Sequence, residues 1–176
     1  MPAPVGVFEG RRGTLYRKSG LLNKLTTARC LVSSKHPFRK AVEERDEAAI
    51  QAMLADNVVF TSPVVFKPYV GKPITAAILR GVLRIFEDFH YVREIADSNG
   101  LDHALVFETK ISGAPGVQIT GCDFLHFNDE GLIDEFTVMV RPLSGATALS
   151  EAMGAQFDRI QQEALELANT FATARG

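Results

Sequence analysis

Residues 117–127 read VQITGCDFLHF, and their alternation predicts a strand with one apolar face. Every second residue from Val117 onward is apolar or small, except for the acidic Asp123. Side chains alternate between the two faces of a strand, so the carboxyl of Asp123 is expected to point into the apolar interior. Burial disfavours the charged form of a carboxyl group. Asp123 is therefore the candidate acid or hydrogen-bond donor of an internal site.

Further strands are expected on both sides of this stretch. Together, the predicted strands cover residues 90–97, 103–112, 117–127 and 132–141. The segments between them are short and rich in Gly, Asn, Asp, Ser and Pro, so they suit hairpin turns. The sequence from residue 90 therefore predicts an antiparallel meander.

The register of the last hairpin supports an inward Asp123. A turn at Asp129-Glu130 places Asp123 opposite Phe136 and Gly121 opposite Val138, so that the inner face stays apolar or small. In the preceding hairpin, a two-residue loop would turn charged side chains inward. A bulge or a loop of odd length would instead place Leu105, Phe107 and Ile111 inside. We prefer the bulge.

Helical patterns flank the predicted sheet. Apolar residues at helical spacing predict a helix from Pro37 to Asp56-Asn57, with Asp46 as the alternative cap of a second, abutting helix. A short strand follows at 58–61, then a proline-containing loop, then a helix from Pro73 that extends through Phe89. An amphipathic helix is expected from Thr147 onward. This order of elements predicts an α+β fold with the helices closing one face of a curled sheet.

Composition and charge exclude several classes of function. The chain has 176 residues, 46% of them hydrophobic, and no apolar run approaches the length of about 20 residues that crosses a bilayer. Two cysteines, Cys30 and Cys122, are too few for a disulfide framework. The cysteine count and the lack of a membrane-spanning run predict a cytoplasmic protein that does not bind membranes. Nucleic acid is not expected as a partner, because residues 36–176 carry a net charge of −8.

Residues 1–35 differ in charge from the rest of the chain. They contain seven basic residues against Glu9, a net charge of +6. This composition, rich in Ser, Thr and Arg, is typical of an organelle transit peptide, which would make the protein mitochondrial. A disordered tail, a start assigned too far upstream and an arm packed on the domain are alternatives. We predict three parts: a flexible basic extension over 1–35, an α+β domain over 36–142, and a C-terminal helix over 143–176 that packs on the domain or on a partner.

The order and spacing of short motifs resemble the nuclear transport factor 2-like superfamily, which includes ketosteroid isomerases and SnoaL-like polyketide cyclases. The resemblance covers about residues 36–142 and is carried by AMLADN at 52–57, VFTSP at 59–63, Gly71 before a helix, and CDFLHFN at 122–128. It implies a cone-shaped curled sheet that encloses an apolar pocket with its helices. It also implies dimerisation, which Phe124, Thr137 and Met139 on the outer sheet face would serve.

The isomerase pattern fits this chain at one position only. The resemblance implies a general base just before Pro63, where this chain has Ser62, and oxyanion-hole tyrosines where it has Phe38 and Leu79. Asp123 alone matches, at the position of an acid that stays protonated in isomerases. Steroid isomerisation is therefore not expected, and a SnoaL-like cyclase with one pocket acid is the closer comparison.

Two functions stay open at this stage. One is an isomerase or cyclase, or a related lyase or hydrolase, in which Asp123 acts as a lone acid or base on a small hydrophobic molecule. The other is a non-catalytic module that binds a ligand or dimerises. In addition, Asp123 could be a buried structural acid with no part in either function. The residues expected to line the pocket are Phe38, Phe60, Ser62, Phe66, Tyr69, Ile78, Phe86, Phe136 and Val138, with Ser62 and Tyr69 as hydrogen-bond helpers.

No cofactor or metal site is predicted. His36, His90, His103 and His126 lack the spacing of metal ligands. The glycines at 113 and 116 belong to a hairpin turn and not to a phosphate-binding loop.

Overall fold

The computed structural model describes residues 36–173, so the predictions about the basic segment 1–35 lie outside the described residues. The chain begins with two short helices, α1 (Pro37–Glu43) and α2 (Glu47–Ala52). Asp46 caps α2, because its carboxylate accepts a hydrogen bond of 2.9 Å from the backbone N–H of Ala49. The alternative of a second, abutting helix is confirmed. The expected helix end at Asp56-Asn57 is wrong, because those residues already belong to the first strand.

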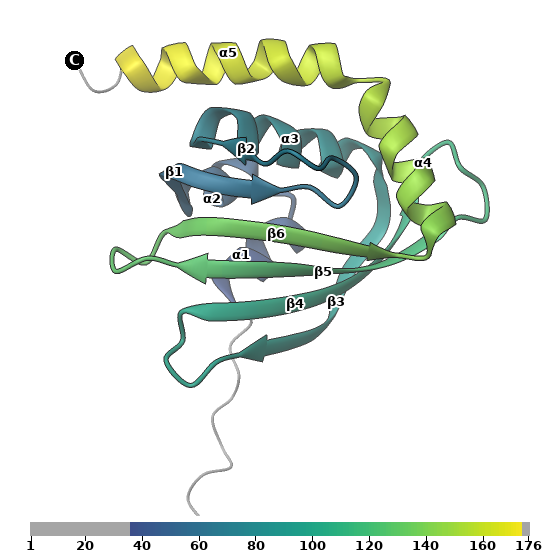
Figure 1. The fold of residues 1–176 in the computed structure, drawn as a ribbon, viewed down its shortest axis with the longest axis horizontal. Helices are drawn as coiled ribbons and strands as arrows, with labels where there is room; N and C mark the ends of the chain where they lie inside the picture. Colours follow the sequence, from purple (N-terminus) through teal and green to yellow (C-terminus); the bar gives the residue numbers. More distant parts are fainter. Residues whose placement is uncertain (1–35, 174–176) are drawn as a thin grey trace, which may run out of the picture. The chain divides into compact units, whose positions relative to one another are not determined.

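A curled six-stranded sheet forms the centre of the domain (Figure 1). Its strands, in the order β2-β1-β6-β5-β4-β3 across the sheet, are β1 (Leu54–Thr61), β2 (Tyr69–Val70), β3 (Phe86–Ala96), β4 (Asp102–Ile111), β5 (Gln118–Phe127) and β6 (Ile133–Arg141). The predicted meander is confirmed as β3 to β6. The sheet is not wholly antiparallel, since β1 pairs in parallel with β6. No hairpin joins these two strands, so the chain is free to bring them together in the same direction.

The register keeps Asp123 on the inner face. Asp123 pairs with Leu105 of β4 and with Val138 of β6. The predicted pairing with Phe136 is wrong by two residues, because the β5–β6 turn is longer than two residues and the register shifts next to Phe127. A shift of two residues leaves every side chain on its predicted face.

The β4–β5 hairpin turns the expected side chains inward. Leu105, Phe107 and Ile111 are all buried. The pairing runs without a shift from Asp102 to Lys110, so a loop of odd length sets this register and the preferred bulge is absent. The bulges occur in β3 instead, where Asp88 has a φ of +53°.

Three longer helices complete the fold: α3 (Lys72–Ile85), α4 (Leu143–Gly154) and α5 (Phe157–Thr173). The helix expected through Phe89 ends at Ile85, because the chain pairs with β4 from Phe86 onward. The single helix expected from Thr147 is divided into α4 and α5. None of the described helices is both long and apolar enough to span a membrane.

The helices α3 and α5 lie against each other, as Figure 1 shows. Gly81 of α3 faces the buried Ile160 of α5, and Gln156 at the corner between α4 and α5 donates a 3.0 Å hydrogen bond to the Gly81 carbonyl. Arg84 of α3 is paired with Glu163 of α5. The helix α4 instead packs against β4, β5 and β6, so the break between α4 and α5 lets the chain cover both the sheet and α3.

Candidate functional site

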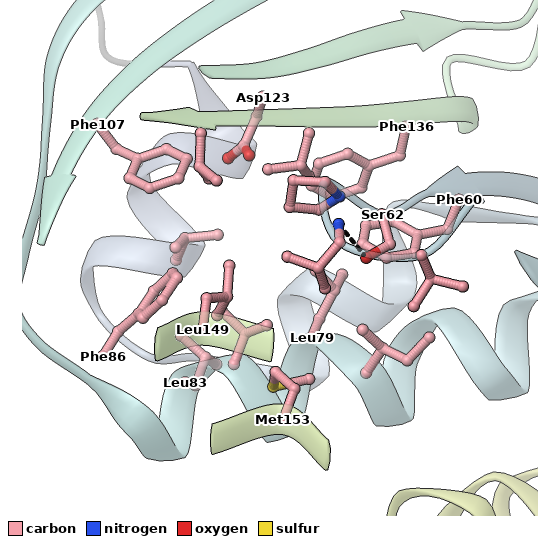
Figure 2. A pocket seen from close by; sticks show the side chains of 18 of the residues that line it. Phe60, Ser62, Leu79, Leu83, Phe86, Phe107, Asp123, Phe136, Leu149 and Met153 are labelled. Carbon is pink, nitrogen blue, oxygen red and sulfur yellow. Dashed lines mark hydrogen bonds between the residues drawn. The ribbon is translucent and has the colours of Figure 1, made fainter. Parts of the chain in front are cut away.

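An apolar cavity of about 270 Å³ lies between the inner face of the sheet and the helices α3 and α4. Figure 2 shows the carboxyl of Asp123 pointing into it between Phe107 and Phe136, with leucines of α3 and α4 on the far side. Its volume is close to the lower end of the range of about 300–1,000 Å³ that is usual for small-molecule sites.

Most of the residues predicted for the pocket are brought together by the fold. Asp123 lines the cavity together with Phe38, Phe60, Ser62, Tyr69, Ile78, Phe86, Phe136 and Val138. Phe66 does not, because its side chain is fully exposed in the loop between β1 and β2. Pro63 and Pro68 keep that loop out of the sheet, so strand alternation does not decide where Phe66 points. The prediction that Phe66 is a pocket wall is wrong.

Asp123 is the one acidic side chain among the residues that line the cavity. Only 6% of it is exposed. Burial raises the pKa of Asp123 to about 7, and a hydrogen bond from Tyr91 opposes part of that rise. Both the neutral and the charged forms of the carboxyl are therefore populated near neutral pH.

Tyr91 of β3 is the partner that sequence reasoning missed. Its hydroxyl donates a hydrogen bond of 2.6 Å to Oδ2 of Asp123, and both residues are buried. Burial, together with the neighbouring Asp123, holds the pKa of Tyr91 well above its ordinary value, so this hydroxyl keeps its proton. Asp123 is thus the one acid of the cavity lining, as expected, but its hydrogen-bond partner is Tyr91 and not Ser62 or Tyr69.

The sequence places Tyr91 in a strand, and the pairing of that strand with β4 turns its side chain inward. Tyr91 lies within the predicted strand 90–97 and pairs with Phe107, one of the residues expected to face inward. The isomerase pattern implies hydroxyl donors at the positions of Phe38 and Leu79 on the helices. The hydroxyl in this structure comes instead from β3, the edge strand that β4 separates from β5.

The helix α1 holds the backbone of Tyr91 in place. Arg39 donates a 2.8 Å hydrogen bond to the Tyr91 carbonyl, and its guanidinium carbon lies 6.0 Å from the centroid of the Tyr91 ring. Glu43 accepts a 3.2 Å hydrogen bond from the Tyr91 backbone N–H and is ion-paired with Arg39. The sequence of α1 thus places one charged pair directly against the strand that carries Tyr91.

Ser62 and Tyr69, the two proposed helpers, lie on the cavity wall without a described hydrogen bond to Asp123. The hydroxyl of Ser62 accepts a 3.3 Å hydrogen bond from the backbone N–H of Val64, which is the local turn role of a serine before proline (Figure 2). The Tyr69 ring packs between Phe60 and Phe157, with centroids 6.4 and 6.3 Å away.

The described histidines lie outside the cavity lining. His126 is paired with Asp134 at 2.7 Å, and the rings of His36 and His103 lie 4.4 Å apart. Within residues 36–173, no group of three or more His, Cys, Asp or Glu side chains is arranged to hold a metal ion.

The sequence model of the SnoaL-like domain matches residues 37–136, which is more than half of the chain. This protein belongs to the SnoaL-like family. A search of curated proteins returned no match.

Solved structures similar to this SnoaL-like protein support the assignment. A steroid delta-isomerase from Pseudomonas aeruginosa is 36% identical, with a TM-score of 0.65 over 71% of this chain and 89% of that one. An uncharacterised cystatin-like-fold protein from Silicibacter pomeroyi is 34% identical, with a TM-score of 0.63 over 68% of this chain and 82% of that one. A candidate polyketide cyclase from Pseudomonas putida shares the fold at 17% identity, with a TM-score of 0.51 over 62% of this chain and 89% of that one.

Proposed function

We propose that this SnoaL-like protein binds a small, neutral, hydrophobic carbonyl compound and that Asp123 moves a proton on it. The observation that carries the proposal is a buried acid at the wall of a mostly apolar cavity, where burial raises its pKa to about 7. A group whose pKa lies near the working pH can both give and take a proton, which is what a general acid or base requires.

The composition of the cavity wall argues for a neutral ligand. No Arg, Lys or His is among the residues that line it. A carboxylate or phosphate would lose its hydration there without gaining a cationic partner, and it would lie close to the partly charged Asp123. A ligand with an apolar body and one oxygen that accepts a hydrogen bond from Asp123 fits these walls.

The site also limits which reaction it can catalyse. Ionised Asp123 would take a proton from a carbon next to the carbonyl, and the carboxylic acid so formed would return it to carbon or to oxygen. No second carboxyl lines the cavity, and the position just before Pro63, where the isomerase pattern has a general base, is occupied by Ser62. The substrate must therefore have an acidic carbon of its own. Steroid isomerisation, the activity for which the Pseudomonas aeruginosa protein is named, is still not expected here.

The experiment uses 2-tetralone, a neutral bicyclic ketone with an acidic carbon between its carbonyl and its aromatic ring. In D₂O, the wild-type protein is expected to accelerate exchange of these carbon-bound protons over buffer, as followed by proton NMR. Asp123→Asn should lose at least about 100-fold of that acceleration, the usual contribution of general acid–base catalysis. Calorimetric titration with 2-tetralone measures binding separately.

The matched control is Asp129→Asn, which removes an exposed carboxyl from the β5–β6 turn. It should exchange 2-tetralone at the wild-type rate. Equal exchange by wild type and Asp123→Asn would contradict a catalytic Asp123. Binding without accelerated exchange would support the second function, a non-catalytic carrier of apolar molecules.

The outer sheet face supports dimerisation as a second property. Phe124 and Met139 are 43% and 60% exposed there, next to Thr137. We expect a homodimer by analytical ultracentrifugation, and Phe124→Asp should make it monomeric by placing a charge in the interface. Leu165→Asp, at a 67% exposed position of α5, is the control that should stay dimeric. A monomeric wild-type protein would refute the proposed homodimer.

A further inference from the structure

We infer that Tyr91 is a positioning residue, which fixes Oδ1 of Asp123 as the oxygen that exchanges a proton with the ligand. This inference rests on the proposed function of Asp123, and it adds a residue from a different strand to the site. The hydroxyl of Tyr91 donates a 2.6 Å hydrogen bond to Oδ2, which leaves Oδ1 as the other oxygen of the carboxyl. Figure 2 shows that this carboxyl points into the cavity.

The packing of Tyr91 prevents its hydroxyl from moving away from Asp123. Its ring lies edge-on to Phe89 and to Phe107, with centroids 4.9 and 6.2 Å away, and only 3% of the residue is exposed. Arg39 and Glu43 hold its backbone on the other side. Because the ring is packed against two phenylalanines and the backbone is fixed by α1, the hydroxyl of Tyr91 is directed at one acceptor, Oδ2 of Asp123.

The proton balance gives each oxygen a separate role. In neutral Asp123 the proton is on Oδ1, because Oδ2 accepts from Tyr91. Ionised Asp123 first takes the proton of the carbon next to the carbonyl onto Oδ1, and the C–H electron pair stays on the ligand, which becomes an enolate. When the Oδ1–H bond then breaks and the proton forms a bond to the enolate oxygen, the Oδ1–H electron pair stays on the carboxylate. The Tyr91 hydrogen bond then becomes charge-assisted and stronger, so it stabilises the ionised state. In the reverse direction, Oδ1 takes a proton from the ligand and Tyr91 keeps its own.

Among residues 36–173, no charged group replaces the neutral Tyr91 hydroxyl in this role. Arg39 and Glu43 of α1 face the backbone of Tyr91. Cys122, the titratable neighbour of Asp123 on β5, lies on the opposite face of the strand. The cavity-lining residues from β4, β6, α3 and α4 are uncharged. The hydrogen bond from Tyr91 is therefore the interaction that favours ionised Asp123.

The test measures the pKa of Asp123 in the full-length protein without any ligand, by carbon NMR of the aspartate carboxyls. The Asp123 signal is assigned by its loss in Asp123→Asn. In Tyr91→Phe, the pKa should rise from about 7 by about 1 to 2, because a charge-assisted hydrogen bond is lost. Tyr69→Phe removes another hydroxyl from the cavity wall and should leave the pKa of Asp123 unchanged.

A second measurement uses the wild-type protein, so the inference stays testable even if Tyr91→Phe does not fold. The ring carbon that bears the Tyr91 hydroxyl should titrate with the Asp123 midpoint, and this response should be absent in Asp123→Asn. An unchanged or lowered pKa of Asp123 in Tyr91→Phe, or a Tyr91 signal without that midpoint, would overturn the inference. Because neither measurement needs a substrate, failure of 2-tetralone exchange would refute the proposed function and leave the role of Tyr91 to be judged by these titrations.

Discussion

Asp123→Asn is expected to gain stability relative to the wild type as the pH rises from about 4 to about 8. The folded-state pKa of Asp123 is raised to about 7 by burial, above the value of an unfolded aspartate. Between these two pKa values the folded protein holds a proton that the unfolded chain releases. The contribution of Asp123 to wild-type stability is therefore greatest below the unfolded pKa, falls as the pH rises, and levels off above about 7.

The unfolding free energy of Asp123→Asn minus that of the wild type should increase by about 4 kcal/mol between pH 4 and pH 8. Urea denaturation at one-unit steps from pH 4 to pH 8 measures it. Asp129→Asn removes an exposed carboxyl from the β5–β6 turn and is the matched control for the loss of a carboxyl group. A difference between Asp123→Asn and wild type that stays constant over this pH range would show that Asp123 titrates as an ordinary carboxyl.

The inward position of Asp123 could be predicted because strand alternation is a local property. The alternation at 117–127 and the opposing apolar residues of the next strand fixed the face, and an error of two residues in the register did not change it. The pocket walls on strands and helices followed from the same periodicities. Phe66 did not, because a loop between two prolines has no periodicity that orients its side chains.

Other features depend on contacts between residues far apart in the chain. Phe86 and Phe89 continue the spacing of α3, and only pairing with β4 places them in a strand. The bulge between Glu87 and His90 then changes which side chains of β3 face inward, and this is how Phe86 and Tyr91, five residues apart, both reach the cavity. The Tyr91–Asp123 hydrogen bond spans two strand pairings, which no local pattern encodes. Likewise, α4 and α5 separate because each packs on a different partner.

The second large effect is expected at Gly121, which lies opposite Phe107 on the wall beside Asp123. A Cβ atom at residue 121 would lie 2.2 Å from Cζ of Phe107, well inside van der Waals contact. Phe107 is 2% exposed, so the direction in which its ring can give way is toward the cavity that it lines. Gly121→Ala should therefore lower the unfolding free energy by about 1–3 kcal/mol, the usual range for overpacking.

Phe107→Ala gives the converse defect and completes a double-mutant cycle. Alone, it should cost about 3–5 kcal/mol by leaving a cavity. In that background, Gly121→Ala no longer meets the ring, so its cost should shrink by at least about 1 kcal/mol or change sign. Gly154→Ala, where an added Cβ meets nothing within 4 Å, is the control and should not destabilise.

The cycle also bears on the site, because the same ring borders the carboxyl. If the methyl group of Gly121→Ala pushes Phe107 toward the cavity, calorimetric affinity for 2-tetralone should fall along with stability. If the losses of unfolding free energy for Gly121→Ala and Phe107→Ala are additive in urea denaturation, the packing of the Phe107 ring does not require a residue without a side chain at position 121. Strong coupling with weakened binding would instead show that Gly121 is required so that an aromatic wall can lie next to a buried acid.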